Sequence, residues 1–341
     1  MGDILHALPA VTALRKMHPG WLIDWVVEPK WRALLTADGA TGRDTNAAEP
    51  RQPVVDGLHF AATKEWRKAP LGEQTRDELK ALRAALRAGA YDTVIDLQGA
   101  VRSAALARLT GCRRRIGEAE PRERAARLLY TERVRTTGAH VIEQDLELAA
   151  QIAGDELDYT QAMLPFDVEA EVWADALLKP AQPAVLINPG AGWGAKRWPV
   201  ERYGAVARGL QDRGMRVLVN AGPGEEPLAE AIVEATGGAA TVLNASLERL
   251  IAVTRRIALL VAGDTGPLHL ACALGKPVVG IYGPTDPARN GPFGTPSRVL
   301  RHPESRRDHT RRAEPEAGLL TIEPEAVLHA AEELLYSETT Q

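Results

Sequence analysis

The sequence predicts an α/β protein built from two doubly wound, parallel-sheet domains that face a cleft. The first observation is the length of 341 residues, because a single domain usually has about 100–200. The second is the alternation of short β-branched or Leu-rich runs with longer helical patterns, which is the order of βαβ units in a parallel sheet. The third is a set of polar or glycine-rich turns directly after several apolar runs, where open α/β sheets bind ligands.

In the first half of the chain, runs of apolar and β-branched residues predict strands at 21–27, 54–60 and 91–98. Segments with apolar residues at helical spacing predict helices at 3–17, 73–87, 100–109 and 141–152. A doubly wound domain normally opens with a strand, whereas this chain opens directly at a helix N-terminus. Either Met1 is a start internal to the real gene product, or the domain has lost its first strand, and we expect the former.

The second half repeats the pattern with shorter and more apolar strands. Its predicted strands are 184–188, 216–220, 241–243, 259–262 and 278–282. Its predicted helices are 200–213, 227–235, 247–253, 268–274 and 324–336. Residues 156–182 include a polar run and two prolines and precede Pro183, which is typical of a connection. The predicted organisation is a first domain at 1–155, a linker at 156–182, a second domain at 183–322, and a C-terminal helix and tail at 323–341.

Composition excludes several classes of protein. Apolar residues make up 45% and charged residues 25% of the chain, which excludes wholesale disorder, collagen and a coiled coil. Aromatic residues make up only 5%, which argues against a stacking surface for nucleic acid, so no such partner is expected. No uninterrupted apolar run approaches the roughly 18–20 residues of a membrane-spanning helix. Cys112 and Cys272 lie far apart without zinc-ligand spacing, which indicates a reduced, cytoplasmic chain.

The net charge of -4 hides a difference between the two halves. Residues 1–155 contain 23 basic and 21 acidic residues, a balance of +2, whereas 156–341 contain 18 and 24, a balance of -6. Residues 102–135 alone hold ten arginines and four glutamates. The first half can therefore present a basic pocket to an anionic partner. The run Arg113–Arg115 is expected to be a solvated charge run.

The most informative turn follows the predicted strand 259–262 and reads GDTGPLHL at 263–270. Asp264 precedes Thr265, which can cap a helix, and Gly266, which lets a ligand approach the backbone. The exposed amides and the dipole of such a helix form an anion site. An ordinary capped helix is the alternative, and His269, one turn further on, is by itself more often a structural histidine.

Two further turns belong to the same predicted domain. The turn NPGAGWGAKRWP at 188–199 contains three glycines and Lys196, which could hold a phosphate, although it has neither Walker nor GxGxxG spacing. An ordinary glycine-rich turn is equally consistent with it. In NAGPGEE at 220–226, Glu225 or Glu226 could bind ribose hydroxyls or simply favour the helix dipole. Together the three turns suit a nucleoside diphosphate.

Asp3, at the start of the chain, is a helix N-cap on one interpretation and a candidate general base on the other. It belongs to the first of six segments that share a recognisable order. These are GDILHALP at 2–9, DWVVE at 24–28, YDTVIDLQG at 91–99, GAKRWP at 194–199, GDTGPLH at 263–269 and YGPTDP at 282–287. The six segments resemble the lipopolysaccharide heptosyltransferases of glycosyltransferase family nine, and most of all their heptosyltransferase I branch.

The resemblance implies a GT-B fold of two Rossmann-like domains, with the acceptor in the first and ADP-heptose in the second. It implies an inverting transfer of L-glycero-D-manno-heptose to a Kdo hydroxyl of Kdo-lipid A, with no metal and no other cofactor. Asp3 matches the family's catalytic aspartate. The residues that match the donor site are Lys196, Glu225 or Glu226, Asp264, Thr265, Gly266 and His269.

On the acceptor side, Lys64, Arg67 and Lys68 resemble the family's basic Kdo loop, although Glu65 departs from the expected basic residue. Arg122 aligns with an arginine of a Pro-Arg-Glu segment. The protein is expected in the cytoplasm, in peripheral contact with the inner-membrane leaflet through basic residues. Three alternatives stay open: heptosyltransferase II or a relative with another acceptor or ADP-sugar, a GT-B nucleotide-sugar epimerase, and a non-catalytic binding protein.

Overall fold

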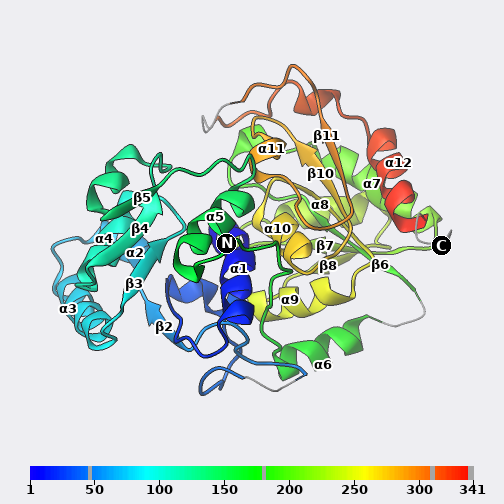
Figure 1. Cartoon of the computed structure of the whole chain (residues 1–341). Helices are drawn as coiled ribbons and strands as arrows, with labels where there is room; N and C mark the ends of the chain where they lie inside the picture. Colours follow the sequence, from blue (N-terminus) through cyan, green and yellow to red (C-terminus); the bar gives the residue numbers. More distant parts are fainter. Residues whose placement is uncertain (45–47, 179–181, 308–311, 337–341) are drawn as a thin grey trace. The chain divides into compact units, whose positions relative to one another are not determined.

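The computed structural model describes residues 1–44, 48–178, 182–307 and 312–336 (Figure 1). The first of two compact units comprises Asp3–Phe166, and the second begins at Asp167. None of the helices in the described ranges is long and apolar enough to cross a membrane.

The described part of the first unit contains short parallel strands and seven α-helical or 3-10 segments that flank them. In chain order the elements are α1 (Gly2–Met17), β1 (Asp24–Val27), η1 (Pro29–Leu34), β2 (Gly57–Phe60), α2 (Thr63–Lys68), α3 (Glu73–Ala88), β3 (Thr93–Asp96), α4 (Val101–Leu109), β4 (Arg114–Glu118), η2 (Arg124–Leu129), β5 (Glu132–Val134) and α5 (Val141–Ala153). Among the described residues, β1 pairs with β2 in one parallel sheet, and β3, β4 and β5 form a second one. The strands end at Val27, Asp96 and Glu118, so the turns that follow them lie at carboxyl ends of parallel strands.

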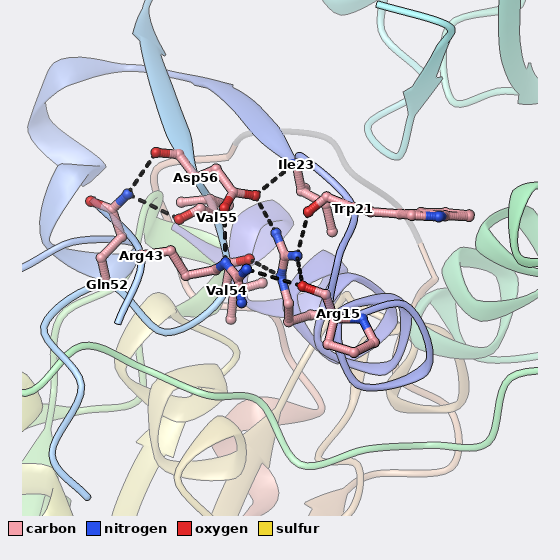
Figure 2. Close-up of polar contacts among 9 residues, drawn as sticks. Arg15, Trp21, Ile23, Arg43, Gln52, Val54, Val55 and Asp56 are labelled. Carbon is pink, nitrogen blue, oxygen red and sulfur yellow. Dashed lines mark hydrogen bonds and ion pairs between the residues drawn. The ribbon is translucent and has the colours of Figure 1, made fainter. Parts of the chain in front are cut away.

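Helix α1 is buried along most of its length, from Leu5 to Arg15. Arg15 lies near its C-terminal end and keeps only 4% of its side chain exposed. Its guanidinium forms an ion pair with Asp56, whose carboxylate also accepts a hydrogen bond from Arg43 Nε at 2.8 Å (Figure 2). The same guanidinium donates to the carbonyls of Val54, Pro19 and Trp21. Because removing one partner of a buried ion pair typically costs about 3–5 kcal/mol, this network fixes α1 within the first unit.

The second unit is a doubly wound parallel sheet. Its elements are α6 (Val168–Leu177), β6 (Ala184–Asn188), η3 (Gly194–Lys196), α7 (Val200–Asp212), β7 (Arg216–Asn220), α8 (Glu226–Ala235), β8 (Thr241–Leu243), α9 (Leu247–Arg256), β9 (Leu259–Gly263), α10 (Gly266–Ala273), β10 (Val278–Tyr282), α11 (Pro287–Asn290), β11 (Ser297–Arg301), η4 (Leu319–Thr321) and α12 (Pro324–Tyr336). The strand order is β11-β10-β9-β6-β7-β8, and every neighbouring pair is parallel. The predicted parallel-sheet α/β class is confirmed.

Alternation along the strands builds the core of the second unit. Val185 and Ile187 of β6, with the matching residues of β7, β9 and β10, pack against the apolar faces of α7, α8 and α12. Helices α9 and α10 lie on the other side of the sheet and contact each other (Figure 1). Strands β6, β9 and β10 are buried at every residue, as expected of a sheet covered on both faces. The carboxyl ends of β6, β7 and β9 therefore open three turns at one edge of the sheet.

The unit boundary differs from the predicted linker at 156–182. Residues 156–166 belong to the first unit, and α6 belongs to the second. The physical reason is Glu171 of α6, which is buried and pairs with Arg255 Nε at 3.0 Å and with Arg256, both on α9. Residues 179–181 lie outside the described part of the chain. Helix α12 contributes Val327 and its neighbours to the core, so the predicted C-terminal helix is part of the second unit.

Several elements differ from the sequence prediction. Arg113–Arg115 was predicted to be a solvated charge run; Arg113 is exposed as predicted, but Arg114 and Arg115 lie partly buried in β4. Arg114 Nε pairs with Glu132 of β5 at 3.0 Å, and Arg115 Nε donates to the carbonyl of Leu129 at 3.0 Å. The predicted basic loop at Lys64, Arg67 and Lys68 is instead the short helix α2.

Candidate active site

Asp3 lies in the first turn of α1 rather than at its N-cap, which is Met1, so the N-cap interpretation is wrong. Its side chain is 47% exposed. Gln98 Nε2 donates to Asp3 Oδ2 at 2.6 Å, and Arg122 Nη1 lies 3.7 Å from the same oxygen. Among the described residues, Oδ1 has no hydrogen-bond partner. This oxygen is open to a hydroxyl group, as the geometry of a general base requires.

Gln98 and Arg122 reach Asp3 from the turns that follow β3 and β4, two paired parallel strands. This arrangement brings three sequence-distant residues to one carboxyl edge of a sheet. Arg122 is one of the predicted acceptor residues, whereas Gln98 was not predicted to be a site residue. The sequence signal that could have found Gln98 is its place directly after the strand that ends at Asp96.

Basic side chains gather around the same end of α1. Burial lowers the pKa of the Met1 amino group, and the nearby Asp3 charge opposes this effect. The positive charges of Lys30, Lys64 and Arg102 lower the same pKa further. Burial is the main cause that lowers the pKa of Lys30, and the adjacent Lys64 lowers it further. Lys64 was predicted from the sequence, while Lys30 and Arg102 were missed. These cations suit an anionic ligand.

The other two predicted acceptor residues lie further along α2. Lys68 is exposed and pairs with Glu65 Oε2 at 2.8 Å, and Arg67 is also exposed. Within the described residues, neither side chain forms a hydrogen bond or an ion pair with Asp3.

In the second unit, Asp264 forms the centre of a buried polar group. Its carboxylate, 9% exposed, forms an ion pair with Lys196 and a contact of 3.1 Å with His269 Nε2. Lys196 Nζ also donates to the Asp264 carbonyl at 3.3 Å and lies 4.3 Å from the centre of the Trp193 ring. Burial opposes ionisation of Asp264, but His269 and the Lys196 ammonium outweigh it and hold the pKa of this carboxyl well below its usual range. The structure thus brings together three of the predicted donor residues.

Thr265 occupies the N-cap position of α10, but its side chain does not cap the helix as predicted. Its hydroxyl instead accepts a hydrogen bond from Asn188 Nδ2 at 3.3 Å, and Asn220 Nδ2 donates to Asn188 Oδ1 at 2.7 Å. These buried amides tie together the turns after β6, β7 and β9. The first amides of α10, at Gly266 and beyond, are therefore left for another acceptor at the positive end of the helix.

The structure separates the two candidate glutamates. Glu225 Oε2 accepts a hydrogen bond from the Gly222 amide at 3.3 Å. Its carboxylate lies so close to Gly190 that a Cβ at that glycine would collide with it, and a Cβ at Gly222 would approach it to 2.8 Å. Glu226 is the first residue of α8, and within the described ranges no hydrogen bond joins its side chain to these turns. Glu225 thus lies between the turns after β6 and β7.

Within the described ranges, the residues that commonly bind metals do not form a cluster of three or more that could hold an ion. Cys112 and Cys272 are both buried, and neither is in a disulfide.

Comparison with known proteins identifies the family. The model of glycosyltransferase family 9 (heptosyltransferase) matches residues 79–319. Lipopolysaccharide heptosyltransferase 1 of Escherichia coli K12 is 33% identical over 89% of this chain and 91% of its own length. The relative of the same name from Pseudomonas aeruginosa PAO1 is 29% identical over 86% of this chain and 79% of its own.

A solved structure of the E. coli heptosyltransferase WaaC with ADP is similar to this one, with a TM-score of 0.79 and 30% identity. It covers 98% of this chain and 97% of its own. The predicted resemblance and the GT-B class are confirmed by these matches. The chain belongs to glycosyltransferase family 9, the heptosyltransferases, and is a glycosyltransferase.

Proposed function

We propose that this protein transfers L-glycero-D-manno-heptose from ADP-heptose to a Kdo hydroxyl of Kdo-lipid A, a step of lipopolysaccharide inner-core synthesis. Two similarities support the proposal. The relatives above are named lipopolysaccharide heptosyltransferase 1, and a WaaC structure described as containing ADP-2-deoxy-2-fluoro heptose matches 98% of this chain with a TM-score of 0.76. One observation carries the proposal: the chain contains two different polar groups. The exposed Asp3 carboxylate lies beside cations, and the buried Asp264–Lys196–His269 group lies at a helix N-terminus.

Asp3 acts as the general base in this proposal. Gln98 and Arg122 hold one carboxylate oxygen, and the other takes the proton of the attacking hydroxyl. The hydroxyl oxygen forms a bond to the anomeric carbon while the bond from that carbon to the diphosphate oxygen breaks. ADP leaves with the electron pair, and attack opposite to the leaving group inverts the anomeric centre.

The turns of the second unit bind the donor in this proposal. The amides at Thr265 and Gly266 meet the diphosphate at the positive end of α10, with Lys196 and His269 as additional donors. Asp264 keeps Lys196 in place before the donor arrives. Glu225, rather than Glu226, binds the adenosine ribose, because its carboxylate lies between two of the donor turns.

The acceptor carries carboxylates and phosphates, which suit the cations around Asp3. Lys64 and Arg122 bind it, joined by Lys30 and Arg102. Arg67 and Lys68 of α2 extend the basic surface. The protein works in the cytoplasm and contacts the anionic inner leaflet peripherally through such residues. Sedimentation with anionic vesicles at low salt and release at high salt are the expected results, and absence of cosedimentation at low salt contradicts this contact.

The reaction needs no metal in this proposal, because side chains and helix amides supply the positive charge that meets the leaving diphosphate. Turnover is expected to be unchanged after dialysis against EDTA. Loss of turnover on chelation, restored by a divalent cation, would contradict metal independence without affecting the choice of sugar.

The deciding experiment incubates the purified protein with ADP-heptose, with and without Kdo-lipid A, and follows ADP release and the mass of the lipid. One heptose added to the lipid per ADP released, only with the acceptor present, is the expected result. A changed sugar nucleotide without acceptor would identify an epimerase. Donor binding without turnover would identify a binding protein, and transfer only to an already heptosylated acceptor would identify a heptosyltransferase II activity.

A further inference from the structure

We propose that Asp96 is a positioning residue for Asp3, which it holds through the turn that carries Gln98. The inference rests on the proposed role of Asp3 as the base. Asp96 is the last residue of β3 and is only 6% exposed. No part of the proposed mechanism so far uses this buried carboxylate.

Each oxygen of Asp96 accepts two hydrogen bonds. Oδ1 accepts the amides of Gln98 at 2.9 Å and Gly99 at 3.2 Å, which folds the turn back onto the end of its own strand. Oδ2 accepts the hydroxyls of Ser103 at 2.8 Å and Tyr130 at 2.7 Å. The carboxylate is therefore anchored to α4 and to the residue after η2 while it holds the turn. Four donors on a buried carboxylate make this a rigid support.

The same turn is locked to the segment that carries Arg122. Gly99 has φ +64°, a left-handed conformation, and a Cβ there would approach the Arg122 amide to 3.1 Å. The Gly99 carbonyl accepts the Glu123 amide at 2.9 Å, and Glu123 Oε2 accepts the Val101 amide at 2.8 Å. Gln98 and Arg122, the two residues that hold Asp3 Oδ2, are thus supported by one interlocked pair of turns.

Arg102 fixes the orientation of the Gln98 amide. Its Nε donates to Gln98 Oε1 at 3.4 Å, which leaves the Nε2 donor for Asp3. Asp96 sets the backbone of Gln98, and Arg102 sets its side chain. A shift of this turn moves the donor away from Asp3 and lets the base rotate. Misplacement of a reacting group by about 1 Å can cost on the order of 100-fold in rate.

The test measures kcat and the KM for ADP-heptose in Asp96→Asn, with Asp92→Asn as the matched control. Asp92 is exposed and precedes β3 in the same segment. Asp96→Asn is expected to lower kcat by about 10- to 100-fold with little change in donor KM, and Asp92→Asn to leave both unchanged. Normal kcat in a folded Asp96→Asn protein overturns the proposal.

A double-mutant cycle shows whether Asp96 acts through Asp3. In an Asp3→Asn background, Asp96→Asn is expected to lower kcat little further, because residues that act as a unit are not additive. Full additivity overturns the inference. If Asp96→Asn does not fold, Gln98→Ala takes its place, with the same loss of kcat expected and the same non-additivity with Asp3→Asn. Normal turnover of Asp3→Asn alone would overturn the proposed function instead, so the two failures are distinguishable.

Discussion

Two aspartates near helix N-termini, one in each unit, have opposite environments. Asp3 is 47% exposed and is held by an amide and a distant arginine. Asp264 is 9% exposed, forms an ion pair with Lys196 and lies 3.1 Å from His269. The difference teaches that position beside a helix does not decide the role of a carboxylate. Exposure leaves one oxygen of Asp3 accessible, as a general base requires, whereas two basic partners hold the buried Asp264 as an anion.

The largest effect on stability is expected for Asp264→Asn. This change leaves Lys196, 11% exposed, without its anionic partner. Loss of one member of a buried pair typically costs about 3–5 kcal/mol in free energy of unfolding. Urea denaturation of both proteins at neutral pH measures it. Equal stability of the two proteins would contradict the view that the buried Asp264–Lys196 pair stabilises the folded protein.

The same carboxyl predicts how this difference depends on pH. Because the pKa of Asp264 in the folded protein lies below its ordinary value of 3.8, its stabilising contribution is complete above that value. The contribution is lost as pH falls from about 4 toward the lower pKa of the folded state. Urea midpoints of wild-type protein and Asp264→Asn, measured from pH 7 downward, should therefore converge in acid. A gap that widens in acid has the wrong sign for this account.

A smaller effect is expected on donor binding by the second unit. Glu225→Gln removes the carboxylate that lies against the turns after β6 and β7, and should raise the KM for ADP-heptose by about tenfold, or roughly 1.4 kcal/mol. Glu226→Gln is the matched control, one residue away on α8. Steady-state kinetics of both variants decide the matter. A larger effect from Glu226→Gln would assign the ribose contact to the other residue.

The smallest effect on stability is expected for Asp3→Asn. Its side chain is half exposed, its ion pair with Arg122 is long, and a charge in the first turn of a helix contributes only about 0.3–1 kcal/mol. Thermal unfolding should therefore be close to that of the wild-type protein. A loss comparable to that of Asp264→Asn would mean that Asp3 has a structural role.

The sequence predicted the second unit more closely than the first. Strands β6, β7, β8 and β10 lie at their predicted residues. For β6 and β10 the reason is that continuous apolar runs are typical of strands buried on both faces. In the first unit, β2 begins at Gly57 rather than at residue 54, since the Val54 carbonyl is used by Arg15 instead of a neighbouring strand. Strand β11 escaped prediction because Ser297–Arg301 is an edge strand in which no residue is fully buried.

The residues of the candidate site could also be predicted only in part. Asp264, Lys196 and His269 could be predicted because each lies in a recognisable motif at a strand end. Gln98 could not be predicted to hold Asp3, since the contact joins residues 95 positions apart. The choice between Glu225 and Glu226 was open for a similar reason, because only the folded turns show which carboxylate they enclose.

The central claim is that Asp3 takes part in the chemical step while the Asp264 group binds the donor. A single-turnover experiment on Asp3→Asn tests it most directly, with ADP-heptose bound beforehand and Kdo-lipid A added in excess. We predict wild-type affinity for ADP-heptose and a transfer rate lowered by about 10²–10⁴, the range for loss of a general base. A transfer rate equal to that of the wild-type protein, with the donor bound normally, would contradict the account.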